Sequence, residues 1–360
     1  MTGASRPLLA AALALALAGC ASLAPLSTPA AEDPAEAQTG EAAAPAPEAA
    51  AKPAEAAPAS APEHAADGTA PHPPPRIASG EALFARLAAR LTPPICIRGK
   101  HNRQWRRRFA ADPHAFARQL RVALPLLAWV VEETERRNLP GEFALIPLVE
   151  SGYRVDARAR GGPLGLWQMM PRTARHYGIT ISGGFDGRLS PVDATDAALA
   201  HLDGLLVRLD DWQAAAMAYN AGEGRLRGAL AGGPADARRR RVSGERRLPE
   251  GLAPVTYSYV AKLRALACLV AEPERARLVL PANTFIPLQR LEAPAGTRRL
   301  ADAAAAWSVD VSELVRWNAG HRAQPWPVAA TRGLLAPMAD EASTPERTVG
   351  DASPPRHTGG

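Results

Sequence analysis

The sequence predicts a mainly α-helical protein whose folded part follows a long unstructured segment. Between about residues 80 and 275, apolar residues recur at helical spacing, and most of these runs begin at a capping residue or a proline. No run in this region alternates apolar and polar residues as a half-buried strand does. Before residue 80 the chain is instead rich in alanine, proline and glutamate. We therefore expect one α-helical domain at residues 80–275.

Capping and breaking residues delimit the helices of this region. Asp112 and Pro113 form a typical first turn, and an Asn-Leu-Pro-Gly run at residues 138–141 ends the same helix, which Pro125 is expected to kink. Ser190 precedes a proline in the same way, and Asp211 is a further capping residue. We expect helices at residues 83–91, 113–138, 143–151, 171–178, 191–209 and 253–271, and Asp211 is expected to cap a further segment that contains residues 216–224.

The first 20 residues have the features of a bacterial secretion signal. Arg6 precedes an apolar stretch at residues 8–18 that is too short to span a bilayer. The stretch ends in Leu-Ala-Gly-Cys at residues 17–20, which resembles the lipobox of bacterial lipoproteins. The resemblance implies that Cys20 is lipidated and, because Ala21 follows rather than aspartate, that the product is an outer-membrane lipoprotein facing the periplasm. The alternative is an ordinary signal peptide, residues 1–20, with an incidental cysteine.

Two segments are expected to remain unfolded. Residues 21–79 contain almost no large apolar residue, so burial cannot offset the loss of chain entropy. As an extended linker this segment would reach on the order of 150 Å, which suits a tether between a membrane anchor and a distant substrate. Residues 341–360 are expected to form a loose tail.

The charge of the chain favours an anionic partner. The net charge is +6, and it comes almost wholly from arginine, since the only lysines are Lys52, Lys100 and Lys262. Nucleic acid, lipid headgroups and cell wall would all fit. Nucleic acid makes little sense behind a lipoprotein signal, so we interpret the arginine run at residues 238–241 as a solvated loop near wall or lipid. The histidines show no metal-ligand spacing, and we expect neither a metal nor a cofactor.

Two cysteines remain after Cys20. Cys96 and Cys268 would lie in an oxidising compartment, where they can form one disulfide. Cys268 is also in register with the leucines of an apolar helix, so a buried free thiol is the alternative.

Glu150 is the main candidate for chemistry. It follows the apolar run Phe-Ala-Leu-Ile-Pro-Leu-Val at residues 143–149. A carboxyl group among apolar side chains loses solvation, which raises its pKa and keeps a proton available near neutral pH. A general acid acting on a glycosidic oxygen needs this property. The alternative is a surface glutamate at a helix end.

Two downstream motifs supply an uncharged polar set suited to carbohydrate. In Gly-Pro-Leu-Gly-Leu-Trp-Gln at residues 162–168, the ring of Trp167 offers a face to a sugar and Gln168 can bond hydroxyl or amide groups. In Ala-Tyr-Asn-Ala-Gly-Glu-Gly at residues 218–224, Tyr219 and Asn220 precede a glycine-rich bend. Each motif alone is compatible with ordinary core and a helix cap.

Taken in order, "LIPLVESGY", "GLWQ", "AYNAGEG" and "TYSYVAK" resemble the four motifs of the lytic murein transglycosylase family. The resemblance covers about residues 80–340. It implies a lysozyme-like α-helical catalytic domain, peptidoglycan as substrate and Glu150 as the sole catalytic acid/base. It also implies that Gly165, Trp167, Gln168, Tyr219, Asn220 and Tyr259 bind the substrate, and we expect a monomer.

The family mechanism explains why one carboxylate suffices. Glu150 would protonate the oxygen that links N-acetylmuramic acid to N-acetylglucosamine and then accept the proton of the muramyl C6 hydroxyl, leaving a 1,6-anhydromuramyl end. The family usually has serine or threonine nine residues after the glutamate, where this chain has Ala159. The alternatives are therefore a hydrolytic muramidase and a wall-binding lipoprotein with weakened catalysis.

A separate C-terminal piece is expected at residues 276–340. It contains an extended stretch at residues 283–293, two small helices within residues 300–320 and an apolar end at residues 333–338. This pattern resembles a degenerate lysin motif that lacks the usual Gly-Asp-Thr-Leu opening. We expect a small α/β module that either binds the wall or only packs on the catalytic body.

Overall fold

The computed structural model describes residues 75–182, 184–231, 251–322, 325 and 333–338. Contacts divide the chain into Met1–His72 and Pro73–Gly360, and every described residue belongs to the second unit. The expected signal peptide with Cys20, nearly all of the linker, the arginine run and the tail lie outside the described residues.

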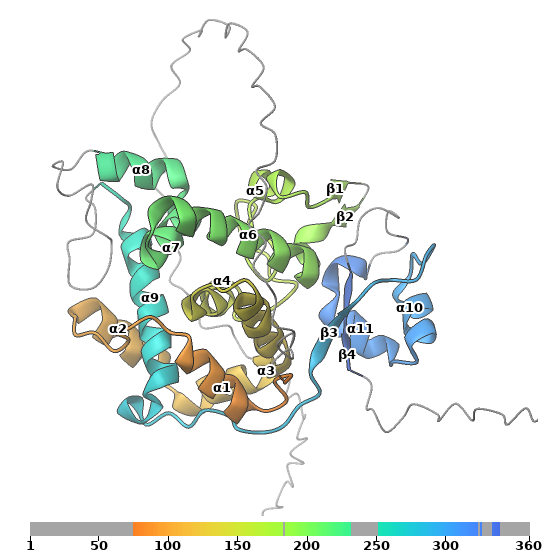
Figure 1. Cartoon of the computed structure of the whole chain (residues 1–360), viewed down its shortest axis with the longest axis horizontal. Coiled ribbons are helices and arrows are strands. Elements are labelled where there is room, and N and C mark those ends of the chain that lie inside the picture. Colours follow the sequence, from red (N-terminus) through yellow and green to blue (C-terminus); the bar gives the residue numbers. More distant parts are fainter. Residues whose placement is uncertain (1–74, 183, 232–250, 323–324, 326–332, 339–360) are drawn as a thin grey trace, which may run out of the picture. The chain divides into compact units, whose positions relative to one another are not determined.

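The described part of the chain is mainly α-helical, as the sequence predicts (Figure 1). Its N-terminal half contains α1 (Gly80–Ala89), α2 (Lys100–Phe109), α3 (Pro113–Arg136), the short 3-10 helix η1 (Gly141–Leu145), α4 (Ile146–Glu150) and α5 (Pro171–His176). It continues with β1 (Ile181–Ser182), β2 (Phe185–Asp186), η2 (Gly187–Leu189), α6 (Pro191–Leu209), α7 (Trp212–Ala221), α8 (Glu223–Ala231), α9 (Pro254–Ala271) and η4 (Pro273–Ala276).

Side-chain caps fix several of these helix starts where the sequence placed them. Asp112 accepts a hydrogen bond from the amide of Ala115, and Ser190 accepts one from Asp193, each just before a proline in the first turn. Asp211 accepts from the amides of two residues at the start of α7. Each cap satisfies amides that have no partner inside the helix. At the end of α3, Asn138 takes a positive φ of 51°, which terminates the helix as expected.

The structure differs from the expected element order in three ways. The single helix expected at residues 143–151 is divided into η1 and α4. The helices α2 and α8 were not predicted. A two-residue strand pair, β1 with β2, interrupts a region that was expected to lack strands.

Helix α9 organises the core of the large helical region. It contacts α2, α7, α1, η1 and α4, and Figure 1 shows it running alongside α2 and α7. Twelve of its residues are buried, and most of these are apolar, so the helix packs against neighbours on several sides. Because α9 touches α4, it brings residues from the fourth motif to the end of the helix that carries Glu150.

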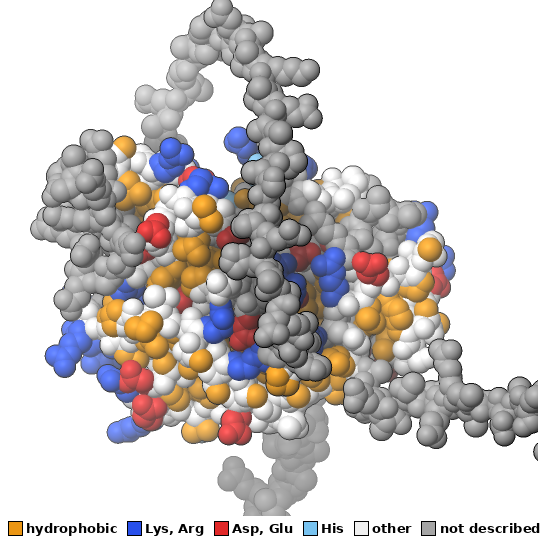
Figure 2. Space-filling view, viewed as in Figure 1, with side chains coloured by type: hydrophobic (Ala, Val, Ile, Leu, Met, Phe, Trp, Pro, Cys, Tyr) orange, Lys and Arg blue, Asp and Glu red, His pale blue; other side chains and the backbone are white. Residues whose placement is uncertain are grey.

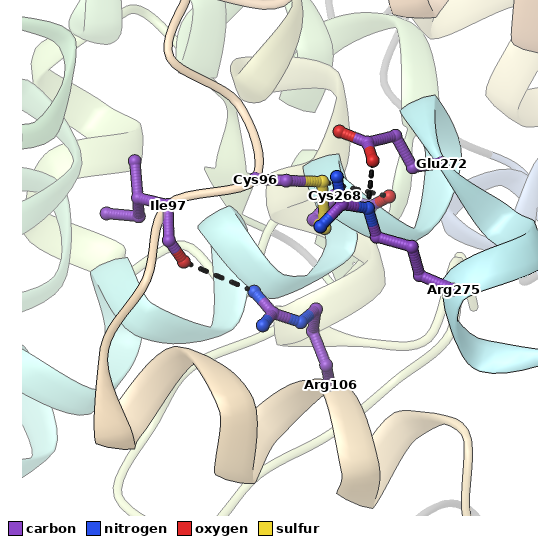
Figure 3. Close-up of a disulfide and its surroundings, with 6 residues drawn as sticks. All are labelled: Cys96, Ile97, Arg106, Cys268, Glu272 and Arg275. Carbon is purple, nitrogen blue, oxygen red and sulfur yellow. Dashed lines mark hydrogen bonds and ion pairs between the residues drawn. A yellow bond between two sulfur atoms is a disulfide. The ribbon is translucent and has the colours of Figure 1, made fainter.

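A disulfide joins the segment before α2 to α9. Cys96 and Cys268 are bonded at an S–S distance of 2.10 Å, although 172 residues separate them (Figure 3). The structure therefore selects the disulfide over the buried free thiol.

The C-terminal piece forms a two-stranded sheet with two helices. Strand β3 (Leu288–Leu291) pairs antiparallel with β4 (Leu334–Pro337), and between them lie α10 (Leu300–Trp307), α11 (Val311–Trp317) and the short η5 (Ala319–His321). The expected extended stretch, paired helices and apolar end are all present. Phe185 of β2 joins the small hydrophobic cluster of this piece, and its ring centroid lies 5.2 Å from that of His321. The piece is thus packed on the large helical region.

Candidate active site

The site is centred on Glu150, the last residue of α4. The other residues of this short helix are apolar, and Ile146, Pro147 and Leu148 are buried. Glu150 itself is half-buried. Loss of solvation raises the pKa of its carboxyl group to about 7, against the opposing effects of a tyrosine hydrogen bond and a nearby lysine. The carboxyl group is therefore divided between its acid and base forms near neutral pH, as predicted from its apolar neighbours.

Helix α9 supplies the two groups that oppose this rise. The buried hydroxyl of Tyr259 donates a hydrogen bond to Oε1 of Glu150 at 2.6 Å. Lys262 lies one helical turn further along α9, and its positive charge lowers the pKa of Glu150. Nζ of Lys262 also lies 4.8 Å from the ring centroid of Trp105 on α2, a cation–π contact that holds the ammonium group in place. Tyr259 was expected to bind substrate, but its described contact is with Glu150.

A sharp turn after Glu150 connects it to the second motif. Gly152 and Tyr153 both have positive φ values, 63° and 64°. The hydroxyl of Ser151 donates to the carbonyl of Leu166 at 2.7 Å, so the end of α4 is fastened directly to the motif that contains Trp167. The turn and this side-chain hydrogen bond together couple the first two motifs.

The second motif is mainly a scaffold. Gly165 has a φ of 79°, and a Cβ atom there would lie 1.9 Å from the carbonyl oxygen of Arg188, so only glycine fits. The side-chain amide of Gln168 donates to the carbonyls of Ala157 and Gly165, at 3.1 Å and 2.8 Å. These bonds hold the loop between α4 and α5 in shape. Both residues were expected to bind substrate, and their described contacts are with the protein's own backbone.

The expectation that Trp167 offers its ring to a sugar is wrong. The side chain is fully buried, with a relative exposure of 0%. Its indole N–H donates to Oγ1 of Thr195 on α6 at 2.8 Å. A buried indole needs such a partner. The residue therefore anchors the motif in the core rather than lining a sugar site.

The third motif closes the scaffold from α7. The hydroxyl of the half-buried Tyr219 donates to the backbone carbonyl of Trp167 at 2.8 Å. Burial and the nearby charge of Glu150 raise the pKa of this tyrosine well above its usual value, so the hydroxyl stays protonated. The next residue, Asn220, is exposed at the end of α7. Of the predicted substrate-binding residues, Asn220 has the most accessible side chain.

Ala159 lies in the exposed loop between the first and second motifs. Its amide donates to the carbonyl of Pro163 at 3.2 Å, and its side chain is exposed. A hydroxyl group at this position would therefore be added at the surface of the loop, without a buried side chain to displace.

Sequence reasoning missed three residues of this site. Lys262 was present in the fourth motif but had no assigned role, although its spacing of three from Tyr259 places both on one helix face. Ser151 directly follows Glu150 and was not singled out. Trp105 lies in α2, which was not predicted.

The described residues include no cluster of three or more histidine, cysteine, aspartate or glutamate side chains able to hold a metal ion. Within the same residues, no helix has the length and apolarity needed to cross a membrane.

Residues 128–240 match a family model described as "Transglycosylase SLT domain". The match includes Glu150 and the motifs around Trp167 and Tyr219. This part of the chain is thus similar to the lytic transglycosylase family. The mainly α-helical architecture agrees with the lysozyme-like domain expected for that family.

Individual relatives cover parts of the chain. Membrane-bound lytic murein transglycosylase D of Escherichia coli (strain K12) is 32% identical over 202 residues, which are 55% of this chain and 43% of that protein. A relative from Alteromonas sp. (strain M-1), named for tributyltin chloride resistance, is 44% identical over 105 residues, 29% of this chain and 51% of the relative. Peptidoglycan transglycosylase gp16 of Escherichia phage T7 is 43% identical over 79 residues, 21% of this chain and 6% of the phage protein. The chain thus spans about half the length of these relatives or less.

Proposed function

We propose that this protein is a peptidoglycan lytic transglycosylase that cleaves the β-1,4 bond between N-acetylmuramic acid and N-acetylglucosamine. The observation that carries the proposal is the environment of Glu150, whose pKa of about 7 allows it to donate and then accept a proton. The groups that act on this pKa in the described part of the chain are Tyr259 and Lys262, and neither is a carboxylate. The printed names of two relatives, a murein and a peptidoglycan transglycosylase, support the substrate.

In the first step, protonated Glu150 donates its proton to the glycosidic oxygen. The bond between that oxygen and the muramyl C1 breaks, and its electron pair leaves with the N-acetylglucosamine hydroxyl. The C1 atom becomes electron-poor, as in the oxocarbenium-like transition states of glycoside cleavage.

In the second step, ionised Glu150 accepts the proton of the muramyl C6 hydroxyl as its oxygen bonds to C1. The product is a 1,6-anhydromuramyl end, no water is consumed, and Glu150 returns to its protonated form. Because the nucleophile belongs to the substrate, a high effective molarity replaces a positioned water molecule. Tyr259 holds the carboxyl group and keeps its pKa from rising further, so that both forms are accessible.

Mass analysis of the fragments released from purified peptidoglycan tests the proposal. We expect fragments that end in 1,6-anhydromuramic acid, one water lighter than the products of hydrolysis. A hydrolytic muramidase, the first alternative, would leave reducing muramic acid ends, and such products would refute the transglycosylase assignment.

The role of Glu150 is tested by Glu150→Gln, which retains the shape of the side chain but removes the transferable proton. We expect fragment release to fall on the order of 10²–10⁴-fold or more, because one residue assists both steps. Glu142→Gln is the matched control, since Glu142 is a buried carboxyl group of η1 that accepts hydrogen bonds from Thr92 and makes none to Glu150. The control should lose stability but retain activity, and a fully active Glu150→Gln would refute the site.

The second alternative, a wall-binding lipoprotein with weakened catalysis, rests on Ala159. If the alanine limits activity, Ala159→Ser should raise turnover several-fold, with an upper limit set by one hydrogen bond of about 1.5–3 kcal/mol. A fall in activity would show that the loop has been adapted to alanine.

We further propose that lipidated Cys20 holds the protein to the outer membrane, facing the periplasm, as a monomer. The lipobox-like sequence and the membrane-bound relative support this location. Cys20→Ala should move the protein from membrane to soluble periplasmic fractions without loss of activity, because each buried methylene of a lipid chain contributes about 0.8 kcal/mol. An unchanged distribution would remove the lipoprotein assignment. Wall binding by the C-terminal module is tested separately, by co-sedimentation of the full chain with peptidoglycan before and after mutation of its exposed surface.

A further inference from the structure

A second concave site lies between α2, the end of α9 and η4. The cavity has a volume of about 600 Å³, and five arginines line it: Arg103, Arg106, Arg107, Arg275 and Arg277. Glu272 is the single acidic side chain of the lining. We refer to this cavity as the α2–α9 pocket. It takes no part in the reaction assigned to Glu150.

The positive charge of the α2–α9 pocket is largely uncompensated. Glu272 is already ion-paired with Arg275. For Arg103, Arg107 and Arg277, the described part of the chain provides no ion pair, and all three are exposed at the rim. In Figure 2, lysine and arginine side chains gather at the edge of the molecule that α2 occupies in Figure 1. An anion entering the pocket would therefore meet several guanidinium groups at once.

Arg106 is the inner arginine of the pocket. It is half-buried, and one of its Nη atoms donates to the carbonyl of Ile97 at 3.4 Å (Figure 3). Burial lowers its pKa, and the neighbouring charges of Arg275 and Arg103 lower it further. The positive charges of Arg103 and Arg275 disfavour the charged form of Arg106, and a bound anion would offset this repulsion.

Part of the pocket lining is apolar and covalently fixed. Cys268 and Leu269 of α9 contribute to it, and Cys268 is tied by the disulfide to Cys96 (Figure 3). Since α2 also packs closely on α9, the helix that carries three of the five arginines is held against the helix that leads into Glu272 and η4. A rigid frame reduces the entropy that a ligand must overcome.

From this arrangement we infer that the α2–α9 pocket binds a phosphate group, either of a soluble phosphate ester or of a lipid headgroup. A carboxylate carries one charge and is satisfied by one bidentate guanidinium group. A phosphate monoester carries about −1.5 to −2 charges and three acceptor oxygens, which matches several converging arginines. The apolar part of the lining leaves room for the carbon-bearing part of such a ligand.

The test compares two charge-matched double variants of the full chain, both in a Cys20→Ala background that removes the lipid anchor. Arg103→Gln/Arg107→Gln removes two rim arginines of the pocket. Arg118→Gln/Arg121→Gln removes two exposed arginines of α3 that do not line it. Circular dichroism first establishes that both variants are folded.

Three probes are then titrated by calorimetry or co-sedimentation: glycerol phosphate, acetate, and vesicles with and without phosphatidic acid, whose headgroup is a phosphate monoester. We expect the pocket variant to lose about tenfold or more in affinity for a phosphate-bearing probe, while the α3 variant matches the parent. Loss of glycerol phosphate binding identifies a soluble ester as the ligand. Loss of vesicle binding alone identifies a headgroup.

The inference is overturned if neither phosphate probe binds, if acetate binds as tightly as glycerol phosphate, or if both double variants weaken binding equally. The last result would show a general charge effect. Fragment release from peptidoglycan, measured on the same variants, should be unchanged. Loss of phosphate binding and loss of fragment release are therefore measured separately. The phosphate-site proposal can be refuted while the proposed reaction is retained, and the proposed reaction can be refuted while the phosphate site is retained.

Discussion

The hydrogen bond between Tyr259 and Glu150 gives the sharpest prediction. Tyr259→Phe retains the buried ring but removes the hydroxyl that donates to Oε1 of Glu150 at 2.6 Å. This bond favours the ionised carboxylate, so its loss raises the pKa of Glu150. A hydrogen bond to a charged group contributes about 1.5–3 kcal/mol, and part of it is retained by the protonated form. We therefore expect the pKa to rise by about one unit from its value near 7.

The sign of the effect on activity follows from the first step, which requires protonated Glu150. Activity is lost as pH rises through the pKa of the acid, so the basic limb of the pH profile should move up by about one unit in Tyr259→Phe. The assay is the clearing of purified peptidoglycan between about pH 5 and about pH 10. The maximum rate should also fall, because the ionised form that accepts the second proton is disfavoured.

Tyr257→Phe is the control, because Tyr257 lies on the same helix but its hydroxyl accepts a hydrogen bond from the amide of Leu252. Its basic limb should remain that of the parent. In Tyr259→Phe, the basic limb of the pH–activity profile could instead stay in place or move to lower pH. Either result would refute the assignment of Glu150 as the acid held by Tyr259.

Three further outcomes follow from the structure. Lys262→Met removes a positive charge that lowers the pKa of Glu150, so the basic limb of the pH–activity profile should again move to higher pH. Lys262→Arg retains the charge and should leave this limb nearly in place. Equal pH–activity profiles for the two variants would contradict the role of the charge. Glu150→Gln should stabilise the fold above pH 7. The pKa of Glu150 in the folded state is about 7, above the ordinary value of 4.5, so the folded protein binds more protons than the unfolded chain between these two pH values. The stability of the wild type therefore falls as pH rises through this range, whereas that of the variant does not. The difference should reach about 2–4 kcal/mol at alkaline pH and vanish near about pH 4, as measured by thermal unfolding, and a difference independent of pH would contradict it. Cys96→Ser opens a loop closed across 172 residues and should lower the free energy of unfolding by about 2–5 kcal/mol in urea titrations. Adding a reductant to the parent protein should lower its stability in the same way. An unchanged urea midpoint in Cys96→Ser would contradict this prediction.

The fold could be predicted from the sequence where local signals determine it. Helix α6 begins after the Ser190 cap and ends at Leu209, as expected, because the cap, the proline and the apolar face all act within the helix itself. Helix α2 could not be predicted from the sequence, because it has no side-chain cap and only one buried residue, Asn102, to mark its apolar face. Its stability comes from packing on α9, more than 140 residues later in the chain, which no local pattern encodes.

The same division holds for the site. Glu150 could be found because its apolar neighbours are adjacent in the sequence. The contact of Tyr259 with Glu150 spans 109 residues, so the sequence indicated the residue but not its partner. Trp167 was misassigned because its glycine-rich neighbourhood is typical of an open turn, whereas a hydrogen bond to Thr195 draws the indole into the core. Burial of that kind depends on α6, outside the motif.

The disulfide between Cys96 and Cys268 bears on when the surroundings of Glu150 become fully formed. Cys268 follows Tyr259 and Lys262 on α9, so the bond tethers the helix that completes the surroundings of Glu150. A chain emerging from its N-terminus exposes Cys96 long before Cys268, and reducing cytoplasm keeps both thiols free. If the chain is exported as proposed, we expect the covalent tether to form only after residues 96–268 have crossed the membrane. On the proposed location, the tether of α9 would form in the same compartment as the proposed substrate.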